Sequence, residues 1–516
     1  MEGLGAGPGG SALSRCVNNA KRMLGGMCLS VVLVACGGGG GGGTEPEPES
    51  VQSSTPGNPT APPPTSPPPS PPPQSSTKLQ PAWQTMQGNA AHTGHVPVQL
   101  GRSRPVVAWE WPTTAEDPSA PAIYPVVTGN GAVYVATESR YCAASLHALD
   151  GLSGALRWTR EFPGACNFNP PAVGGDRVYV ATTGHDSAVL WALRTDNGEQ
   201  VFSSPYENLR YEALAPTVYG GAIYTSGGRE GGVHAFDLSG AQLWSGPASD
   251  TDMYAPAVDN AHVYHYSGTS LEMWERTTGR HLGSILDTPA GAGSAGYDGA
   301  PMIGGHGNVI VYSRSPDGNG RVLSSFNMES RLREWTTARP YDTEPAVANG
   351  VVYAASTAGM RVDAIDEATG AVLWSWSPAP GQGDTAFRHN IIVTDDVLLV
   401  STDVAVHAVD LATRQSIWRH DQPGRLALSG HFLFLATGGH ASDGRLVALD
   451  LGGSAGATAA ADASPTPAAV AGPTPVAAAP ELARPASGGR LQAIGGAALS
   501  ARVNAVPPTD GNGEGG

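Results

Sequence analysis

The sequence predicts an all-β protein, an eight-bladed β-propeller of four-stranded antiparallel blades. One reason is composition: 69 Gly and 44 Pro among 516 residues, with only 14% charged residues, are typical of a turn-rich β fold. A second is an internal repeat of roughly 40–45 residues, the length of one blade. The third is a recurring strand phrase, a β-branched residue followed by Tyr. It occurs as Val133-Tyr134, Val178-Tyr179, Ile223-Tyr224, Val263-Tyr264, Val311-Tyr312 and Val352-Tyr353, and Leu398 and Phe434 take the Tyr place in two further copies.

Each repeat contains four short strands. A Pro-Ala-Val-like strand and a tight turn such as Ala348-Asn349-Gly350 precede the Tyr phrase, and Gly and Asn supply the positive φ of two-residue hairpins. A third strand ends in an acidic turn, as at Asp150, whose side chain we expect to bond its own turn backbone. The fourth strand carries a bulky residue: Trp158, Phe202, Trp244, Leu282, Trp335, Trp374 or Trp418.

The eighth copy lacks a fourth strand, because the sequence after Asp450 has no strand pattern. A matching unpaired strand, Val106–Trp111, lies ahead of the first blade. We therefore expect this N-terminal strand to complete the last blade. Closing the ring in this way removes exposed sheet edges.

The flanks of the repeats predict a lipoprotein. Residues 1–35 have the basic, apolar and small-residue order of a signal peptide, and Leu33-Val34-Ala35-Cys36 resembles the bacterial lipobox, in which the Cys is lipidated. The alternative is an ordinary signal peptide with an incidental Cys36. Residues 36–78, a Gly run followed by Pro and Ser, predict a disordered tether. Residues 79–451 form the propeller, and residues 452–516 an Ala/Pro/Gly-rich disordered tail.

Location follows from the same segment. Gly37 after the lipidated Cys favours the outer membrane, facing the periplasm, with surface exposure left open. Two cysteines remain in the propeller, Cys142 and Cys166, and in an oxidising compartment they predict one disulfide. The net charge of −16 and the pI near 5.3 argue against a nucleic-acid partner, which would need a basic stripe.

A family resemblance rests on the turn that follows each third strand. Asp366, Gly370 and Trp374, like Asp150, Gly154 and Trp158, stand at the spacing of the PQQ-like propeller repeat. The segment Trp83–Gly94 resembles the motif that precedes the first blade in such proteins. The resemblance covers about residues 80–450. It implies either a quinoprotein dehydrogenase or a non-catalytic lipoprotein similar to BamB, because the same fold serves both.

The chemistry of the dehydrogenases is not recognisable in the sequence. The resemblance implies a vicinal Cys-Cys disulfide and a Glu/Asn/Asp calcium site, and the chain has no adjacent cysteine pair and no assignable triad. We expect no catalytic residue, metal ligand or cofactor, with a divergent PQQ-dependent oxidoreductase as the alternative. His147, His234 and His407 recur at one position in separate blades, which predicts packing rather than a metal cluster.

A binding face is the remaining functional prediction. One aromatic residue stands ahead of the first strand of seven blades, and four Arg lie in loops of the same face. These residues are Tyr124, Phe168, Tyr211, Tyr254, Tyr297, Tyr341 and Phe387, with Arg140, Arg210, Arg229 and Arg388. Aromatics with Arg are typical of protein-binding hot spots, although packing between blades would give the same spacing. We expect a monomeric scaffold that binds an envelope protein or assembly complex, with a carbohydrate or cell-wall binder as a further alternative.

Overall fold

The structure is a computed structural model that describes residues 78–112, 122–139, 143–165, 167–183, 188–206, 215–227, 232–246, 255–287, 300–315, 320–437 and 444–452. The signal peptide, Cys36, the tether up to residue 77 and the tail from residue 453 lie outside the described residues. Cys142 and Cys166 also lie outside them. Within the described part of the chain, no helix has the length and apolar character needed to cross a membrane.

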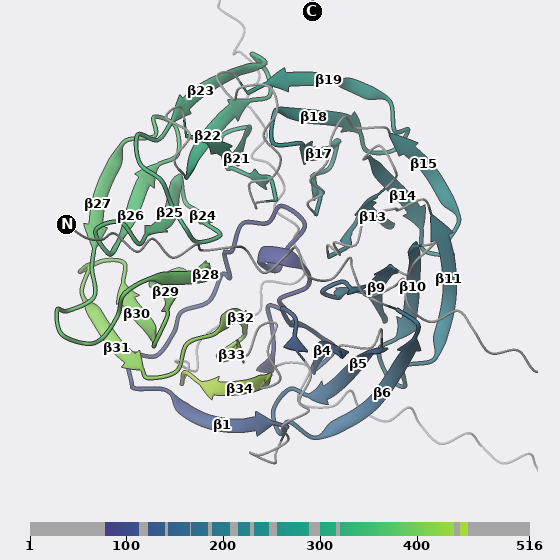
Figure 1. Cartoon of the computed structure of the whole chain (residues 1–516), viewed down its shortest axis with the longest axis horizontal. Coiled ribbons are helices and arrows are strands. Elements are labelled where there is room, and N and C mark those ends of the chain that lie inside the picture. The colour runs from purple at the N-terminus through teal and green to yellow at the C-terminus, as the bar shows by residue number, and fades with distance from the viewer. Residues whose placement is uncertain are drawn as a thin grey trace, which may run out of the picture. The chain divides into compact units, whose positions relative to one another are not determined.

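Eight antiparallel sheets stand around a central axis, as Figure 1 shows. Blade 1 contains β2 (Ala122–Ile123), β3 (Val127–Gly129), β4 (Ala132–Ser139), β5 (Ala143–Asp150) and β6 (Leu156–Pro163), and blade 2 contains β7 (Asn167–Phe168), β8 (Ala172–Gly174), β9 (Arg177–Thr183), β10 (Ala188–Arg194) and β11 (Gln200–Tyr206). Blade 3 contains β12 (Thr217–Tyr219), β13 (Ala222–Ser226), β14 (Val233–Asp237) and β15 (Gln242–Gly246), and blade 4 contains β16 (Ala257–Val258), β17 (His262–Tyr266), β18 (Ser270–Glu275) and β19 (His281–Leu286).

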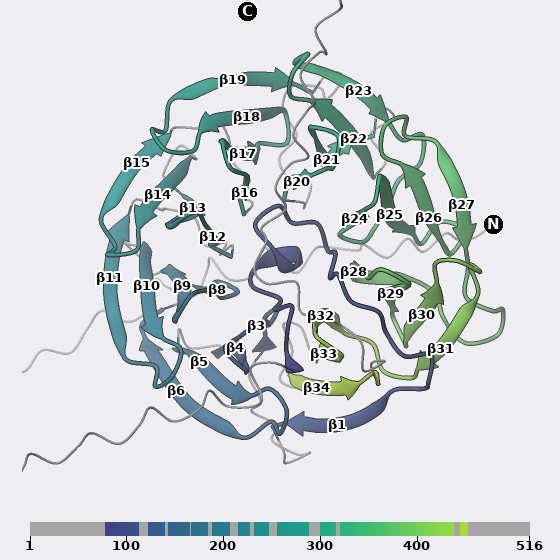
Figure 2. The ribbon, with the colours of Figure 1, turned by 180° about the vertical axis from the view of Figure 1, so that it is seen from behind.

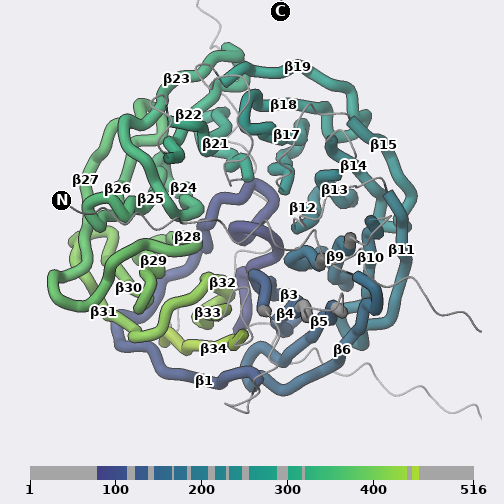
Figure 3. The backbone as a smooth tube through the Cα atoms, viewed as in Figure 1, coloured from purple at the N-terminus to yellow at the C-terminus, as the bar shows by residue number. Residues whose placement is uncertain are grey.

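The second half of the ring repeats this order (Figure 3). Blade 5 contains β20 (Met302–Ile303), β21 (Asn308–Arg314), β22 (Arg321–Asn327) and β23 (Leu332–Thr336), and blade 6 contains β24 (Ala346–Ala348), β25 (Val351–Ser356), β26 (Arg361–Asp366) and β27 (Val372–Trp376). Blade 7 contains β28 (Phe387–Val393), β29 (Val397–Thr402), β30 (Val406–Asp410) and β31 (Ser416–His420), and blade 8 contains β32 (Arg425–Ser429), β33 (Phe432–Thr437), β34 (Arg445–Asp450) and β1 (Val106–Trp111).

The last blade is closed by the N-terminal strand, as predicted. Its strand order is β1-β34-β33-β32. β1 pairs antiparallel with β34, from Val106 opposite Asp450 to Trp111 opposite Leu446. The predicted eight-bladed fold and its closure are confirmed. In blades 1 and 2 the innermost strand is split into two short pieces that pair with the same second strand.

The repeated residues join neighbouring blades. The Trp158 indole N–H donates to the Thr195 carbonyl of blade 2 (3.0 Å), and a Cβ on Gly198 would lie 2.6 Å from the Trp158 ring. Gly198 therefore lets the ring approach, and its φ of 72° suits the turn. The Asp150 carboxylate accepts the N–H groups of Leu152 and Ser153, which confirms its predicted structural role in the turn.

Residues 79–94, the hub, fill the centre of the ring and contain the short 3₁₀ helix η2 (Met86–Gly88) (Figure 2). Hub carbonyls accept backbone N–H groups from seven blades, and the Thr85 hydroxyl donates to Pro216 of the remaining blade, blade 3 (2.7 Å). The blade donors are Thr128, Val173, Val258, Ile303, Val347, Val393 and Gly430. A single segment thus hydrogen-bonds to all eight blades.

Residues 95–104, the strap, lead from the hub across blade 7 to β1 at the rim (Figure 2). Val96 and Val98 are buried, and the Val96 N–H donates to Val393 of β28. Arg102 forms ion pairs with Asp396 and Asp410, the second at the end of β30. The strap therefore contacts blade 7 and leads into β1, the strand that completes blade 8.

The antiparallel order gives the ring two faces. The loop face carries the connections between blades and those between second and third strands, and the turn face carries the tight turns within blades. The described chain begins and ends at one turn of blade 8, on the turn face. The Ser429 hydroxyl donates to the Leu79 carbonyl (2.8 Å), and the Leu451 N–H donates to the His431 carbonyl (2.9 Å).

Candidate functional site

Three of the predicted binding-face aromatics lie in the core. Phe168, Tyr341 and Phe387 are each at most 1% exposed, so the prediction that they present their rings on the surface is wrong. Phe168 packs on Phe162 (ring centroids 4.9 Å apart), and the Tyr341 hydroxyl donates to buried Asp363 (2.9 Å). The regular spacing of these rings reflects packing between blades. It gives no support to a ring of aromatics that stacks on sugars.

The other members of the predicted face divide into two groups. Tyr124 is half-buried against the core, and Arg388 is exposed. The rest lie outside the described residues, as do both cysteines of the predicted disulfide: Arg140, Tyr211, Arg210, Arg229, Tyr254 and Tyr297. Arg388 is thus the described member of the face that is exposed.

The recurring histidines pack against rings of the preceding blade, as predicted. Ring centroids lie 5.0 Å apart for His147 and Trp111, 5.4 Å for His234 and Tyr206, and 5.4 Å for His407 and Trp376. The three histidines belong to blades 1, 3 and 7 and do not meet. They are structural side chains at blade junctions.

Arg388 lies at an irregularity of β28, the innermost strand of blade 7. The register with β29 shifts between Arg388 and Ile391, which marks a β-bulge. His389 has φ 62°, and it is the one non-glycine residue with a positive φ inside a described strand. A bulge re-aims side chains and is frequent beside functional sites. Here it turns Arg388 and His389 outward, and both are exposed.

The residues behind the bulge hold it rigidly. The Glu344 N–H donates to the His389 carbonyl (2.8 Å), and the Ile391 N–H donates to the Glu344 carbonyl (3.0 Å). The buried Asn390 amide donates to Gln87 of the hub (3.1 Å) and to the Leu426 carbonyl of blade 8 (3.0 Å). The bulge is thus fixed to blade 6, blade 8 and the hub.

The charges at this place are unequal. The Arg425 guanidinium donates to the Glu344 carboxylate (2.6 Å), so these two charges form an ion pair. Among the described residues no ion pair or side-chain hydrogen bond joins Arg388 to a partner. Arg388, Arg425 and Glu344 together carry a net charge of +1, in a chain with a net charge of −16. Unlike the chain as a whole, this place is positive.

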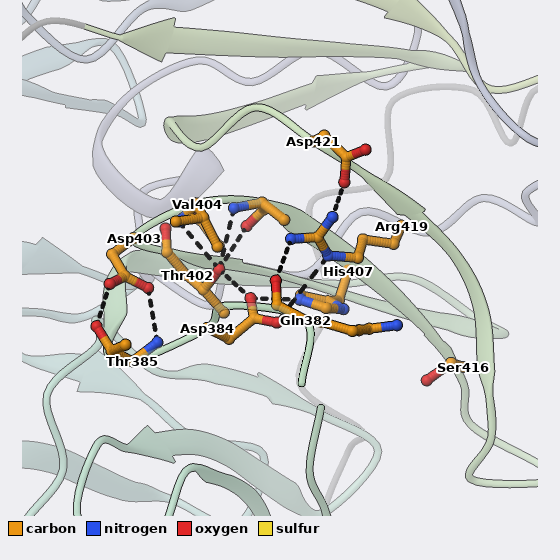
Figure 4. Close-up of polar contacts among 12 residues, drawn as sticks. Gln382, Asp384, Thr385, Thr402, Asp403, Val404, His407, Ser416, Arg419 and Asp421 are labelled. Carbon is orange, nitrogen blue, oxygen red and sulfur yellow. Dashed lines mark hydrogen bonds and ion pairs between the residues drawn. The ribbon is translucent and has the colours of Figure 1, made fainter. Parts of the chain in front are cut away.

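The connection that leads into β28 is clamped to blade 7 by a buried polar network (Figure 4). The Asp384 carboxylate accepts a hydrogen bond from the Thr402 hydroxyl (2.5 Å) and lies 2.9 Å from His407 Nε2, and the side chains of Asp384 and His407 are at most 3% exposed. Arg419 donates to the Gln382 carbonyl (3.1 Å) and pairs with Asp421. Burial lowers the pKa of His407, and the hydrogen bond to Asp384 opposes this change. Because burial has the larger effect, the imidazole is neutral at pH 7.

Sequence reasoning found Arg388 but missed the residues that position it. Asp384 and Asn390 are near neighbours of Arg388 in the sequence, whereas Glu344 and Arg425 come from two distant places. One signal was available. Blades 2, 4, 5 and 6 place a Pro two residues before the hub-bonded residue, as at Pro256 and Pro345, whereas blade 7 has Asn390-Ile391-Ile392 in this stretch.

The resemblance to quinoproteins suggests PQQ as a cofactor. The place in this fold where all blades could surround such a flat molecule is the centre of the ring. The hub fills this place, and the cavity beside Gln87 and His92 measures about 20 Å³, room for one water molecule. His92 is held neutral because burial lowers its pKa to about 4. Within the described residues, no group of three or more His, Cys, Asp or Glu is placed to hold a metal ion. The described residues do not fit PQQ with calcium.

The fold and its repeat define a class of protein, the PQQ-like β-propellers. The sequence model of one family, described as outer membrane protein assembly factor BamB, matches residues 99–287 and 305–504. These two stretches make up more than half of the chain, so the chain belongs to this family. A search of curated proteins finds no match.

Solved structures that are similar to this chain include both kinds of protein that the repeat suggests. BamB from Moraxella catarrhalis is 18% identical, with a TM-score of 0.48 over 67% of this chain and 98% of that one. Quinohemoprotein alcohol dehydrogenase from Comamonas testosteroni is 13% identical, with a TM-score of 0.52 over 73% of this chain and 82% of that one. At such identities the likeness to the dehydrogenase shows the fold alone.

Proposed function

We propose that the protein is a non-catalytic scaffold of the bacterial envelope that binds another envelope protein through the loop face. The observation that carries the proposal is the match of the outer membrane assembly factor family over most of the propeller. A binding role is also supported by the ring axis, where the hub leaves a cavity of about 20 Å³ among the described residues.

The positions of the chain ends favour the loop face over the turn face. Both flanks leave the ring at the turn around Gly430 and His431, on the turn face. The described part of the chain thus enters and leaves the ring on the turn face, whereas the loop face carries the bulge with exposed Arg388.

The flanks complete the proposal. We infer that Cys36 is lipidated after removal of residues 1–35, that the protein is an outer-membrane lipoprotein facing the periplasm, and that residues 36–78 act as the tether. We also infer a Cys142–Cys166 disulfide on the loop face and a monomeric state. Labelling with a radioactive fatty acid tests the anchor: Cys36→Ala should abolish the label and release the protein from the membrane fraction.

Site-specific photocrosslinking in the native envelope tests the binding face. A photoreactive residue at exposed Gln382 reports on the loop face, and one at exposed Glu199 reports on the turn face. We expect an envelope protein to be crosslinked at Gln382 in larger yield than at Glu199. Equal yields, or a partner captured at Glu199 alone, would contradict the proposed face.

A further inference from the structure

We infer that the bulge at Arg388 and His389 binds a carboxylate from an acidic segment of the partner protein. The inference rests on the proposed function and names the chemistry of the partner. It is carried by an exposed guanidinium that has no bonded partner among the described residues and stands on a strained bulge of β28, the innermost strand of blade 7.

Backbone strain at His389 makes the arrangement informative. A non-glycine residue at φ 62° is strained, and a regular strand would avoid this conformation. The bulge buries Asn390 in contact with the hub and leaves Arg388 and His389 outside. The hydrogen bonds behind the bulge fix the backbone at Arg388, and a planar guanidinium can bind a carboxylate by two parallel hydrogen bonds.

The charges on the surrounding elements indicate an anion. Blade 6 contributes Glu344 and blade 8 contributes Arg425, and these two neutralise each other. Three further carboxylates lie on elements next to β28, and each is bonded: Asp342 to Thr357, Asp384 to Thr402 and Asp403 to Thr385. Among the described residues, the guanidinium of Arg388 is the charged group here without a bonded partner, and the His389 ring beside it is a further hydrogen-bond donor. An acidic segment would complete this place, whereas a basic segment would meet a like charge.

The Glu344 carboxylate binds an arginine, as the carboxylate of the partner would. It already binds one arginine of the group, Arg425, and removing its charge frees that arginine for an incoming carboxylate. Glu344→Gln should therefore tighten binding while Arg388→Gln weakens it. A variant that only disturbed the local fold would not improve affinity, so the pair of variants separates binding from structure.

A labelled hexaglutamate peptide, with hexaglutamine as its neutral match, is the probe for the purified full chain. Fluorescence anisotropy at low salt should show binding of hexaglutamate alone. We expect Arg388→Gln to weaken it about tenfold, as loss of a charge-assisted hydrogen bond predicts, and Glu344→Gln to strengthen it. Arg339→Gln is the matched control, because Arg339 is exposed on the connection between blades 5 and 6, and it should change the affinity less than twofold.

Two outcomes would overturn the inference: no binding of hexaglutamate, or equal losses in Arg388→Gln and Arg339→Gln, which would indicate diffuse attraction. Competition by millimolar acetate as effective as the peptide would show a small-anion site in place of a protein-docking site. The proposed function is tested separately. If Arg388→Gln still crosslinks the envelope partner from Gln382 in full yield, the loop face binds that partner by other residues.

Discussion

The junctions between blades differ in chemistry around the ring. From blade 8 to blade 3, an aromatic ring at the end of each outer strand packs on the third strand of the next blade. The ring pairs are Trp111–His147, Phe162–Trp191 and Tyr206–His234, with centroids 5.0, 5.4 and 5.4 Å apart. From blade 4 to blade 7, the corresponding junctions contain buried carboxylates that Arg, Tyr, His and Thr side chains contact.

Three aspartates make up the charged arc. Asp287 accepts hydrogen bonds from Arg333 (2.9 Å) and Tyr266 (2.6 Å), Asp363 from Arg361 (3.1 Å) and Tyr341 (2.9 Å), and Asp384 from Thr402 (2.5 Å), with His407 at 2.9 Å. The last junction combines both chemistries, because Trp376 also packs on His407. One repeat thus accepts two kinds of junction. The aromatic kind depends on buried area, and the charged kind depends on every partner being present.

The largest expected effect lies in the aromatic arc. Phe162 is buried between Phe168 and Trp191, so Phe162→Ala removes a ring that touches two others and leaves a cavity. We expect the free energy of unfolding to fall by about 4 kcal/mol. Urea denaturation at low and high salt is the measurement, and the loss should be the same at both. A loss below 1 kcal/mol would mean that this junction does not depend on its ring.

A smaller loss is expected in the charged arc. The Asp363 side chain is fully buried, and Asp363→Ala leaves the Arg361 guanidinium without its carboxylate and the Tyr341 hydroxyl without its acceptor. Because Arg361 keeps some solvent contact, we expect a loss of about 3 kcal/mol in urea denaturation. Asp363→Leu in an Arg361→Met background should recover much of this loss. No recovery would show that packing, and not the unpaired charge, governs the junction.

The boundary between the arcs should respond to pH. His265 of blade 4 lies opposite Glu272 and is fully buried, and burial lowers its pKa from 6.5 to about 4. Above pH 6.5 the ring is neutral in both states, so its contribution is fully present. As the pH falls toward 4, His265 binds a proton in the unfolded chain but stays neutral in the folded chain. By pH 5 the free energy of unfolding has therefore fallen by about 2 kcal/mol.

His265→Val tests this dependence, since other blades carry Val at the same register: Val135, Val180, Val311 and Val400. The free energy of unfolding of the variant should fall about 2 kcal/mol less than that of the parent between pH 7 and pH 5. Parallel pH curves for the two proteins would show that His265 is not the acid-sensitive group. His262→Val, a partly exposed site on the same strand, is the matched control.

The sequence predicts the ring because its signals are local and repeated. The Tyr phrase, the Asp-capped turn and the outer Trp recur at blade spacing, and the missing fourth strand of the last copy leaves one place for Val106–Trp111. Residue spacing does not give side-chain direction. Phe168, Tyr341 and Phe387 recur at regular intervals, but each stands at the end of a strand or outside one, where alternation does not show which way a ring points.

The candidate site was less predictable because it depends on distant contacts. Asn390 bonds to Gln87, and Arg425 pairs with Glu344, across separations of 303 and 81 residues. The bulge has no Gly or Asn signal at its strained position, which is His389. The hub shows the same difficulty: Trp83–Gly94 was recognisable as a motif, but nothing local to it indicates that its carbonyls bond to the blades.

The hub also determines how the molecule bears mechanical force. A pull on Lys78 acts first on Leu79 and the residues after it, whose hydrogen bonds to eight blades are loaded together. The closing strand β1 lies beyond the hub and the strap, so tension does not peel it from β34 one bond at a time. When the protein is pulled from its N-terminal flank, the force therefore acts on the hub. The pairing of β1 with β34 carries no force until the hub has been pulled out.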